Sequence, residues 1–438
     1  ANPDEGRTPQ LRALPHFETV PFERRCSSCE RRGAVVNARV GDEDRPLCEP
    51  CARKRVFGQL AKKDAPAAVK WWHDAGFYWK PEPVRSWASE FEKIRPEAGR
   101  VKVPEDLNEI GEASKPEGFV GIVYADGNNM GALLEELQTP ADYHEFAEAV
   151  YNATRSAVFN ALDAALPFEI LSIGGDDLFL IVPAHVAVRI ACDIAKSVED
   201  KLKDHRLFRW DKTYDWARVQ RCRGISPEQQ CRVSLSVGVV IADAHTPVFY
   251  LEELAGQLLK SAKRRAKWLK RERGYYGGTV DFLALKSVTM ISGTVEQFRA
   301  AALSHGDRRL YARPYTIAEM EALLKSIQSL KRTNFPRNQL YRLRASLRQG
   351  REQSTVDYLY FLSRSDEARK ARGEIEPLWT PNNHAVPHPW RKQLEDDDQW
   401  ETIWHDLVEL WDFVPESPAT PPRDRHGATG DIFPTSPL

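Results

Sequence analysis

The sequence predicts an α+β protein in three parts: a four-cysteine metal module, a central domain of alternating strands and helices, and a helical C-terminal region. Two C-x-x-C motifs lie close together near the start of the chain. Between residues 118 and 288, apolar segments of strand length alternate with segments of helical periodicity. From residue 289 to residue 414, helical apolar spacing predominates.

Composition sets the outer bounds. The chain has 438 residues, of which 42% are hydrophobic, enough for two or three domains with buried cores. The formal net charge of -1 gives no indication of the kind of partner. No run approaches the ~18 apolar residues of a membrane span, and the first residues lack the apolar core of a secretory signal. We therefore expect a cytoplasmic protein without membrane contact.

The first motif pair predicts a structural zinc site. Cys26 and Cys29 form one C-x-x-C motif, and Cys48 and Cys51 form another after eighteen intervening residues. Four thiolates suit tetrahedral zinc, and four protein ligands leave no open position for catalysis. With seven cysteines in all, a metal site in a reducing compartment is favoured over a disulfide framework. Residues 26–63 form this predicted module, after an N-terminal segment of residues 1–25.

The predicted zinc module is basic. Residues 24–63 hold eleven basic and five acidic residues, a net charge of +6. Such a surface either contacts nucleic-acid phosphate or is a solvated basic face, and the sequence leaves both open. Residues 64–117 are interpreted as a packed connector, in which aromatic side chains belong to a core rather than to a base-stacking platform: Trp71, Trp72, Phe77, Tyr78, Trp79 and Trp87.

The central domain, residues 118–288, has a readable element order. A strand at 118–126 is followed by a helix at 140–166, a hairpin at 169–182 and a helix at 184–202. A strand at 231–243, a helix at 251–272 and a short strand at 279–285 complete it. The order β-α-β-β-α-β is the split ferredoxin-like arrangement, which is also the palm of many nucleotide polymerases and cyclases.

Adjacent acids at the hairpin turn suggest a catalytic site. Asp176 and Asp177 follow Gly174-Gly175, a strong turn signal, and by themselves are equally typical of a solvated tip. In the predicted sheet, however, the end of the first strand neighbours this turn, so Asp126 should stand beside them. Three carboxylates at one sheet edge repel one another unless cations lie between them. Mg²⁺ prefers such oxygen ligands, and two ions can activate a hydroxyl and stabilise a leaving pyrophosphate.

The surrounding residues suit a nucleotide. Gly174 and Gly175 allow a phosphate or base to approach the backbone closely. In ADGNNMG, the amide groups after Asp126 can form an anion nest for a triphosphate.

Four segments together resemble a known family. YADGNNMG, SIGGDDLFL, SLSVGVVIA and LLKSAKRRAK, in this order and spacing, resemble the second palm domain of the large polymerase-like subunit of type III CRISPR effector complexes. The double C-x-x-C matches that family's zinc module. The resemblance covers about residues 22–285 and continues more weakly through the helical region. Diguanylate cyclases share the palm fold, but their signature ends in Glu-Phe where this chain has Asp177-Leu178.

The resemblance implies an antiviral nucleotidyltransferase that converts ATP into cyclic oligoadenylate when the complex holds target RNA. Asp126 and Asp176 would hold Mg²⁺ or Mn²⁺, helped by the carbonyl of Gly127. Asp177 would complete the carboxylate cluster and support attack of the 3′-hydroxyl on the α-phosphate. Lys263 would meet the triphosphate, with Arg264 or Lys267 assisting. The other implied nucleotide-binding residues are Asn128, Asn129, Met130, Gly174, Gly175 and Ser236.

The sequence also departs from this family. The family usually carries an N-terminal nuclease domain and a first palm domain, and neither fits into the 25 residues before the first cysteine. The expectation is therefore a C-terminal piece of a longer protein or a reduced version. A homodimer or a separate chain would supply the second palm face.

The helical region, residues 289–414, carries a basic segment. Lys325 to Arg351 include eight basic residues and no acid. In the resembled family this end contacts the small helical subunit and the guide–target RNA duplex, within a complex that also contains backbone subunits. Phosphate contact is favoured over a solvated helix face for Lys331, Arg332, Arg337, Arg342 and Arg344. Residues 400–413 have helical apolar spacing, and the proline-rich residues 415–438 read as a mobile tail.

Three functions remain open at this point. The first is the cyclic oligoadenylate synthase. The others are a non-catalytic RNA-binding or scaffold subunit of the same kind of complex, and a stand-alone cyclic-dinucleotide synthase. The acidic trio Asp126, Asp176 and Asp177 favours an enzyme, since an unused site gives no reason to hold repelling acids together.

Overall fold

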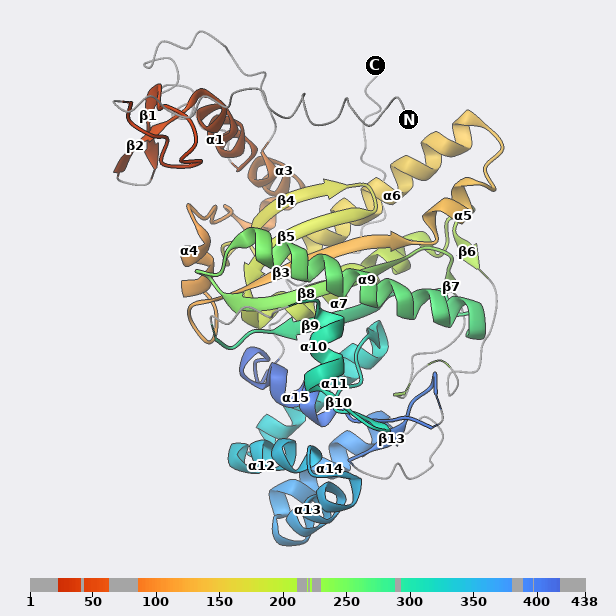
Figure 1. Cartoon of the computed structure of the whole chain (residues 1–438). Helices are drawn as coiled ribbons and strands as arrows, with labels where there is room; N and C mark the ends of the chain where they lie inside the picture. The colour runs from red at the N-terminus through yellow and green to blue at the C-terminus, as the bar shows by residue number, and fades with distance from the viewer. Residues whose placement is uncertain are drawn as a thin grey trace, which may run out of the picture. The chain divides into compact units, whose positions relative to one another are not determined.

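The structure is a computed structural model that divides into two compact units, residues 1–105 and 106–438. It describes residues 23–40, 43–62, 86–210, 219, 221–222, 230–287, 293–379, 389–396 and 398–417 (Figure 1). The expected aromatic core at Trp71, Trp72, Phe77, Tyr78 and Trp79 lies outside these residues, as do residues 1–22 and 418–438. No helix of the described part combines the length and apolarity that crossing a membrane requires.

The N-terminal unit is built on a hairpin and helices. Strands β1 (Val36–Val40) and β2 (Glu43–Leu47) pair antiparallel and lead into helix α1 (Glu49–Lys62). Helix α3 (Trp87–Ile94) and the short 3-10 helix η2 (Pro96–Ala98) follow. The buried centre of the unit combines residues of the hairpin and α1 with the cysteines of both motifs.

The larger unit contains a six-stranded sheet. Its strands are β3 (Phe119–Asn128), β4 (Glu169–Gly174), β5 (Asp177–Pro183), β8 (Ser234–Asp243), β9 (Thr279–Ala284) and β12 (Tyr315–Thr316), in the spatial order β12-β9-β8-β3-β5-β4. Strand β3 is antiparallel to both β5 and β8, and β9 is parallel to β8. The predicted ferredoxin-like palm is therefore confirmed, with β9 and β12 added at one edge.

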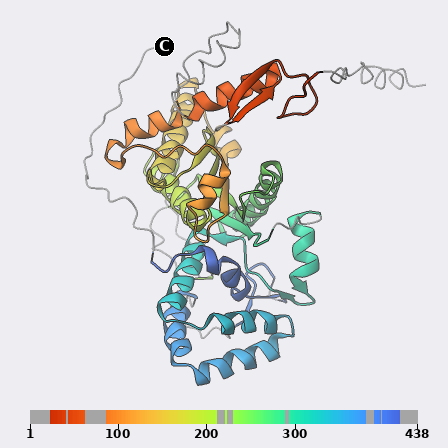
Figure 2. The ribbon, with the colours of Figure 1, turned by 90° about the vertical axis from the view of Figure 1, so that its left-hand side faces the viewer.

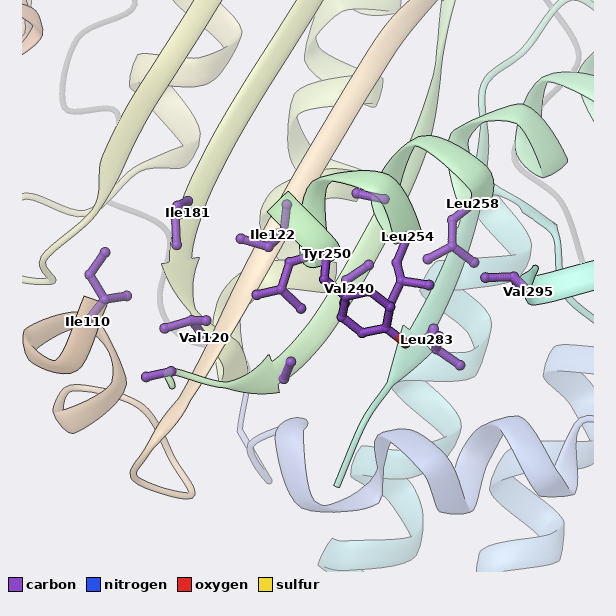
Figure 3. Packing of buried hydrophobic residues seen from close by; sticks show 14 residues of the cluster. Ile110, Val120, Ile122, Ile181, Val240, Tyr250, Leu254, Leu258, Leu283 and Val295 are labelled. Carbon is purple, nitrogen blue, oxygen red and sulfur yellow. The ribbon is translucent and has the colours of Figure 1, made fainter. Parts of the chain in front are cut away.

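Helices cover both faces of the sheet. Helices α6 (Pro140–Ala161) and α7 (Ala184–Leu202) lie on one face, where the missing Cβ of Gly121 lets Ala187 of α7 approach. Helix α9 (Val248–Arg273) lies on the other face, close against Gly238. Figure 3 shows Ile122 and Val240 of the sheet facing apolar side chains of α9, in a buried cluster. Because the apolar face of α9 is packed against the sheet, the opposite, polar face of the helix points away from this core.

Short elements connect the main ones. Helix α4 (Leu107–Glu112) precedes β3, helix α5 (Met130–Leu134) follows it, and β6 (Arg209–Trp210) pairs with β7 (Gln230–Cys231). Helix α10 (Val295–Ala302) follows β9.

The C-terminal region is mainly helical, as predicted. It contains α11 (Ile317–Arg332), α12 (Arg337–Leu347), α13 (Arg351–Arg364), α14 (Asp366–Trp379), α15 (Trp404–Leu410) and η3 (Trp411–Phe413). Figure 2 shows α11 beside α14 and α12 beside α13. Four short strands, β10 (Ser304–His305), β11 (Arg308–Arg309), β14 (Trp400–Glu401) and β13 (Arg391–Lys392), form a small sheet in that order. The helix expected over 400–413 is thus wrong at its start, where Trp400 and Glu401 form β14.

Buried ion pairs join the C-terminal region to the palm sheet. Arg313 is fully buried and donates two hydrogen bonds to the Glu409 carboxylate of α15, at 2.7 and 2.6 Å. The same guanidinium donates to the Phe282 carbonyl of β9. Asp281 of β9 accepts two bonds of 2.7 Å from Arg299 of α10. Separating the two partners of such a pair would leave a buried charge unpaired, which is strongly destabilising. These contacts therefore hold the C-terminal region against the sheet.

Candidate functional site

The four cysteines converge as the motif predicted. Cys26 and Cys29 belong to a knuckle in which the Cys26 amide donates to the Arg32 carbonyl, while Cys48 and Cys51 lie at the start of α1. All four sulfur atoms lie within 4.8 Å of one another, and the Cys29 and Cys48 sulfurs are 3.8 Å apart. Four sulfurs at about 2.3 Å from a zinc ion in tetrahedral geometry are also separated by about 3.8 Å. The donor set therefore fits zinc.

The thiols of this cluster have divergent pKa values. Burial by itself raises the pKa of Cys26, but hydrogen bonds from the backbone near Cys48, Cys29 and Ser28 outweigh it and lower the pKa to about 6. Burial and the neighbouring cysteines raise the pKa of Cys48 to about 12. The protein alone thus favours a thiolate at Cys26 and not at Cys48, and a dication would favour the thiolate form throughout the cluster.

The palm site forms where β3 ends beside the β4–β5 turn. Ala125 of β3 lies opposite Leu178 of β5, so the next residue of β3, Asp126, stands level with the start of β5, where Asp177 lies. The Asp176 side chain lies over the β3 backbone: a Cβ on Gly127 would be 2.6 Å from its Oδ2 atom. The structure thus brings the two predicted acids, Asp126 and Asp176, together at one sheet edge.

Electrostatics at Asp176 reflect this convergence. Burial raises its pKa above the ordinary value, and the nearby carboxylates of Asp126 and Asp177 raise it further, while Lys263 lowers it. A carboxylate whose negative charge is disfavoured in this way has unused affinity for a cation. The site contains the oxygen ligands that Mg²⁺ or Mn²⁺ would use.

Glycines shape the turn. Gly175 has φ +85°, a conformation that side chains other than glycine rarely adopt. A Cβ on Gly174 would be 2.3 Å from Oδ1 of Asp177, so this glycine makes room for the second acid. Asp177 and the two glycines do not line the pocket described below, whereas Asp126, Asp176 and Gly127 do.

Asn128 and Asn129 are held in place by neighbouring strands. Asn128 accepts a 2.8 Å hydrogen bond from Ser236 and donates one of 3.0 Å to Ser234. Asn129 has φ +69° and donates to the Arg232 carbonyl. Ser236 is fully buried and also contacts the hydroxyl of Thr279. Ser236 therefore positions Asn128 through this hydrogen bond and does not itself line the pocket, as a nucleotide-binding residue would.

An open pocket of about 470 Å³ extends from the two acids. Its size is in the range of small-molecule sites. Residues 126–132 and Asp176 line one side, including Asn129 and Met130 from the predicted set. Three lysines of α9, Lys263, Lys267 and Lys270, line the other side. The Lys263 ammonium lies 2.6 Å from Oδ1 of Asp126.

Lys270 is a further residue of the site that was not predicted from the sequence. Its ammonium hydrogen-bonds Oδ1 of Asn129 and lies 5.3 Å from the centre of the Tyr276 ring, another lining residue. The spacing of 263, 267 and 270 places three lysines on one face of a helix, a signal that was present in the sequence. Arg264, expected as a helper, instead pairs with Glu296 at 2.9 Å.

The predicted RNA-contacting residues lie on α11 and α12, in varied surroundings. Lys331 is half-buried and donates to the Val414 carbonyl, and Arg337 pairs with Asp412 at 2.7 Å. Arg332 is exposed and pairs with Glu374 at 3.0 Å. Arg342 is exposed and borders a groove between α12 and α13, whereas Arg344 is only partly exposed.

A family model matches the domain that carries this site. Residues 119–271 match the model described as Cas10/Cmr2, second palm domain. This match supports the resemblance seen in the sequence for this part of the chain. No curated protein matches the chain.

Several solved structures match parts of the chain at low identity. Csm1 from T. onnurineus is 12% identical, with a TM-score of 0.41, over 70% of this chain and 39% of that protein. A Csm1–Csm4 cassette in complex with cA4 is 14% identical, with a TM-score of 0.28, over 41% and 23%. The GGDEF domain of DgcB from Caulobacter crescentus, in complex with c-di-GMP, is 16% identical, with a TM-score of 0.25, over 40% and 85%. The chain spans well under half the length of the two Csm1-containing structures it matches.

Proposed function

We propose that this chain is a nucleotidyltransferase subunit of a type III CRISPR effector complex and makes cyclic oligoadenylate from ATP in response to target RNA. The observation that carries the proposal is the convergence of Asp126 and Asp176 at the end of a pocket whose opposite wall holds three lysines. The match of residues 119–271 to the Cas10/Cmr2 second palm domain supports it.

The acids are suited to a divalent cation. Asp126 and Asp176, with the carbonyl of Gly127, would hold Mg²⁺ or Mn²⁺, and Asp177 would add negative charge from the adjacent strand position. When bound, the metal would supply Lewis-acid activation of the attacking 3′-hydroxyl and charge neutralisation at the phosphates. The raised pKa of Asp176 reflects the same local excess of negative charge that a cation would relieve.

The lysines are suited to the triphosphate. Lys263, Lys267 and Lys270 follow one face of α9, which the buried cluster beneath it holds against the sheet. A fixed row of ammonium groups positions a chain of phosphates and stabilises the pyrophosphate as negative charge develops on it. Lys263 would exchange its contact with Asp126 for a phosphate once a cation neutralises that acid. Asn129 and Met130 contribute the pocket wall where the triphosphate would meet the end of β3.

Other parts of the chain would serve assembly. The four-cysteine cluster would hold one structural zinc ion, because all its positions are filled by protein sulfur. The C-terminal helices would contact the guide and target RNA and the small helical and backbone subunits. A second palm face, from a homodimer or a separate chain, would complete the ATP site.

Product analysis tests the proposal. The protein, alone and within its RNA-loaded complex, is incubated with each nucleoside triphosphate and Mg²⁺ or Mn²⁺, and the products are separated by mass. We expect cyclic adenylate oligomers that depend on the metal and on target RNA. Cyclic dinucleotides made without RNA would instead indicate a stand-alone synthase, and the absence of any product from the complex would indicate a scaffold.

A further inference from the structure

A second candidate site lies beside the four-cysteine cluster of the N-terminal unit. It is a groove of about 440 Å³ between the first cysteine knuckle, strand β2 and helix α1. The palm site described above lies in the other compact unit, so this groove is a separate feature.

The fold places four cationic side chains along this groove. Lys54, Arg55 and Lys62 come from α1 and Arg45 comes from β2. Arg55 and Lys62 lie two turns apart on one face of α1, and Lys54 directly precedes Arg55. Glu105 is the acid in the lining. Outside the four-cysteine cluster, to which the lining residue Cys51 belongs, four cations and one acid give the groove a net charge of +3.

The groove contains several hydrogen-bond donors. Besides the four cations, Ser27 and Ser28 contribute hydroxyl groups. The cations lie close enough to affect one another: burial lowers the pKa of Arg55, with Glu105 opposing and Arg45 adding to the effect. A concave surface with excess positive charge and many donors is complementary to an anion with several oxygen atoms.

We propose that this groove binds the phosphodiester backbone of single-stranded nucleic acid. Its lining is mainly polar, with Leu47, Cys51 and Gly58 as exceptions, and so lacks the apolar centre that anchors a protein partner. Phosphates are bound by this combination of arginine, lysine and serine. Phe57 does not line the groove, but it is 42% exposed and lies three residues from Lys54 on α1, within reach of a base of the bound strand.

The test compares two double variants of the whole chain that remove equal charge from the same unit. Arg45→Ala with Lys54→Ala alters the groove, while Arg31→Ala with Arg32→Ala removes two exposed arginines that do not line it. Fluorescence anisotropy with a labelled oligouridylate and a labelled oligothymidylate gives affinity over a range of salt concentrations. Unchanged zinc content in both variants shows that the unit remains folded.

We expect the groove variant to bind both single strands more weakly and to show a salt slope shallower by about 1.4, the value for two lost phosphate contacts on a single strand. The control variant should retain a slope near that of the wild type. Whichever strand the wild type binds more tightly identifies the source of the phosphates. Equal slopes for the two variants, or undiminished affinity of the groove variant, would overturn the proposal. So would an RNA duplex or a polyglutamate peptide that binds as tightly as the single strands and loses affinity equally in the groove variant.

Discussion

The ammonium nitrogen of Lys263 lies 2.6 Å from Oδ1 of Asp126, across the pocket between α9 and the end of β3. This ion pair joins the two halves of the site, because Asp126 belongs to the acidic edge and Lys263 begins the row of lysines. Without a cation, the lysine balances part of the negative charge. With a metal–nucleotide complex in the pocket, both residues would gain stronger partners.

The first prediction concerns the lysine row. Replacing Lys263, Lys267 or Lys270 by methionine keeps a long apolar side chain and removes one positive charge from the pocket. Each change should weaken ATP binding by about 10- to 150-fold, since a hydrogen bond to a charged group contributes roughly 1.5–3 kcal/mol. Equilibrium binding of a non-hydrolysable ATP analogue measures this.

Lys260→Met is the matched control for the lysine row. Lys260 is an exposed lysine of the same helix that does not line the pocket. Its replacement should leave the affinity unchanged. If the control and the pocket variants lose the same affinity, the lysines act only through the overall positive charge of the helix and not through direct contact with ATP.

The second prediction concerns pH and Asp176. Its pKa is raised by burial first and then by Asp126 and Asp177, so the folded state holds the proton more tightly than the unfolded state does. The free energy of unfolding should therefore decrease as the pH rises from the ordinary pKa of 3.8 through the raised value. Asp176→Asn removes this decrease. Without divalent cations, the variant should match or exceed the wild-type melting temperature at about pH 7.

Thermal unfolding of both proteins from about pH 4 to about pH 8 provides the measurement. Asp204→Asn, at an exposed acid, is the control and should follow the wild type. An Asp176→Asn protein that is less stable than the wild type at every pH would show that the carboxylate supports the fold.

The third prediction concerns the cysteine cluster. The purified protein should contain one zinc ion per chain, and Cys48→Ser should lose it together with the fold of the N-terminal unit, because binding energy in such sites is folding energy. Metal analysis and limited proteolysis follow the two effects. Cys192→Ser, at a buried cysteine of α7 outside the cluster, is the control for zinc content. Protein prepared without chelator and found free of zinc would contradict the assignment.

The fourth prediction concerns RNA at the C-terminal helices. Reversing charge at Lys331, Arg332, Arg337, Arg342 and Arg344 should weaken RNA binding broadly across sequences and flatten its salt dependence. Lys331 donates a hydrogen bond to the Val414 carbonyl, and Arg337 pairs with Asp412. Reversing the charge of either residue therefore disturbs the fold as well. Arg342→Glu is therefore the cleaner single change, with Lys370→Glu on α14 as the exposed control. An unchanged salt slope in the Arg342 variant would identify a solvated helix face.

Sequence patterns were sufficient for the palm and for its acidic edge. Strand-length apolar runs separated by helical segments fixed the order of β3, α6, β4, β5, α7 and β8, and a two-glycine turn located Asp176 beside Asp126. These features are local or follow from one known arrangement of strands. The four-cysteine cluster could also be predicted, because the spacing of the two C-x-x-C motifs is typical of a four-thiolate metal site.

Features that depend on long-range contacts were not readable. Strand β12 has two residues, Tyr315 and Thr316, and no alternation, so nothing local marks it as part of the palm sheet. Trp400 and Glu401 fit a helical pattern but pair with β11 and β13. Arg313 and Glu409 look like surface charges in the sequence and are buried partners in the fold. For Lys270 the sequence shows the shared helix face with Lys263 and Lys267, but not the contact with Asn129, which is distant in the chain.

The yield of nucleotide product from site variants tests the central claim, that Asp126 and Asp176 form a metal-dependent nucleotidyl-transfer site. Wild type, Asp126→Ala and the double variant Asp176→Ala with Asp177→Ala are compared within the RNA-loaded complex, with ATP and Mg²⁺ or Mn²⁺. Circular dichroism confirms that each variant remains folded, and mass spectrometry quantifies the products. The account predicts cyclic oligoadenylate from the wild type and a loss exceeding ~10³-fold in both variants, the scale on which a positioned charge-stabilising group acts. Equal yields from the wild type and the variants would contradict it.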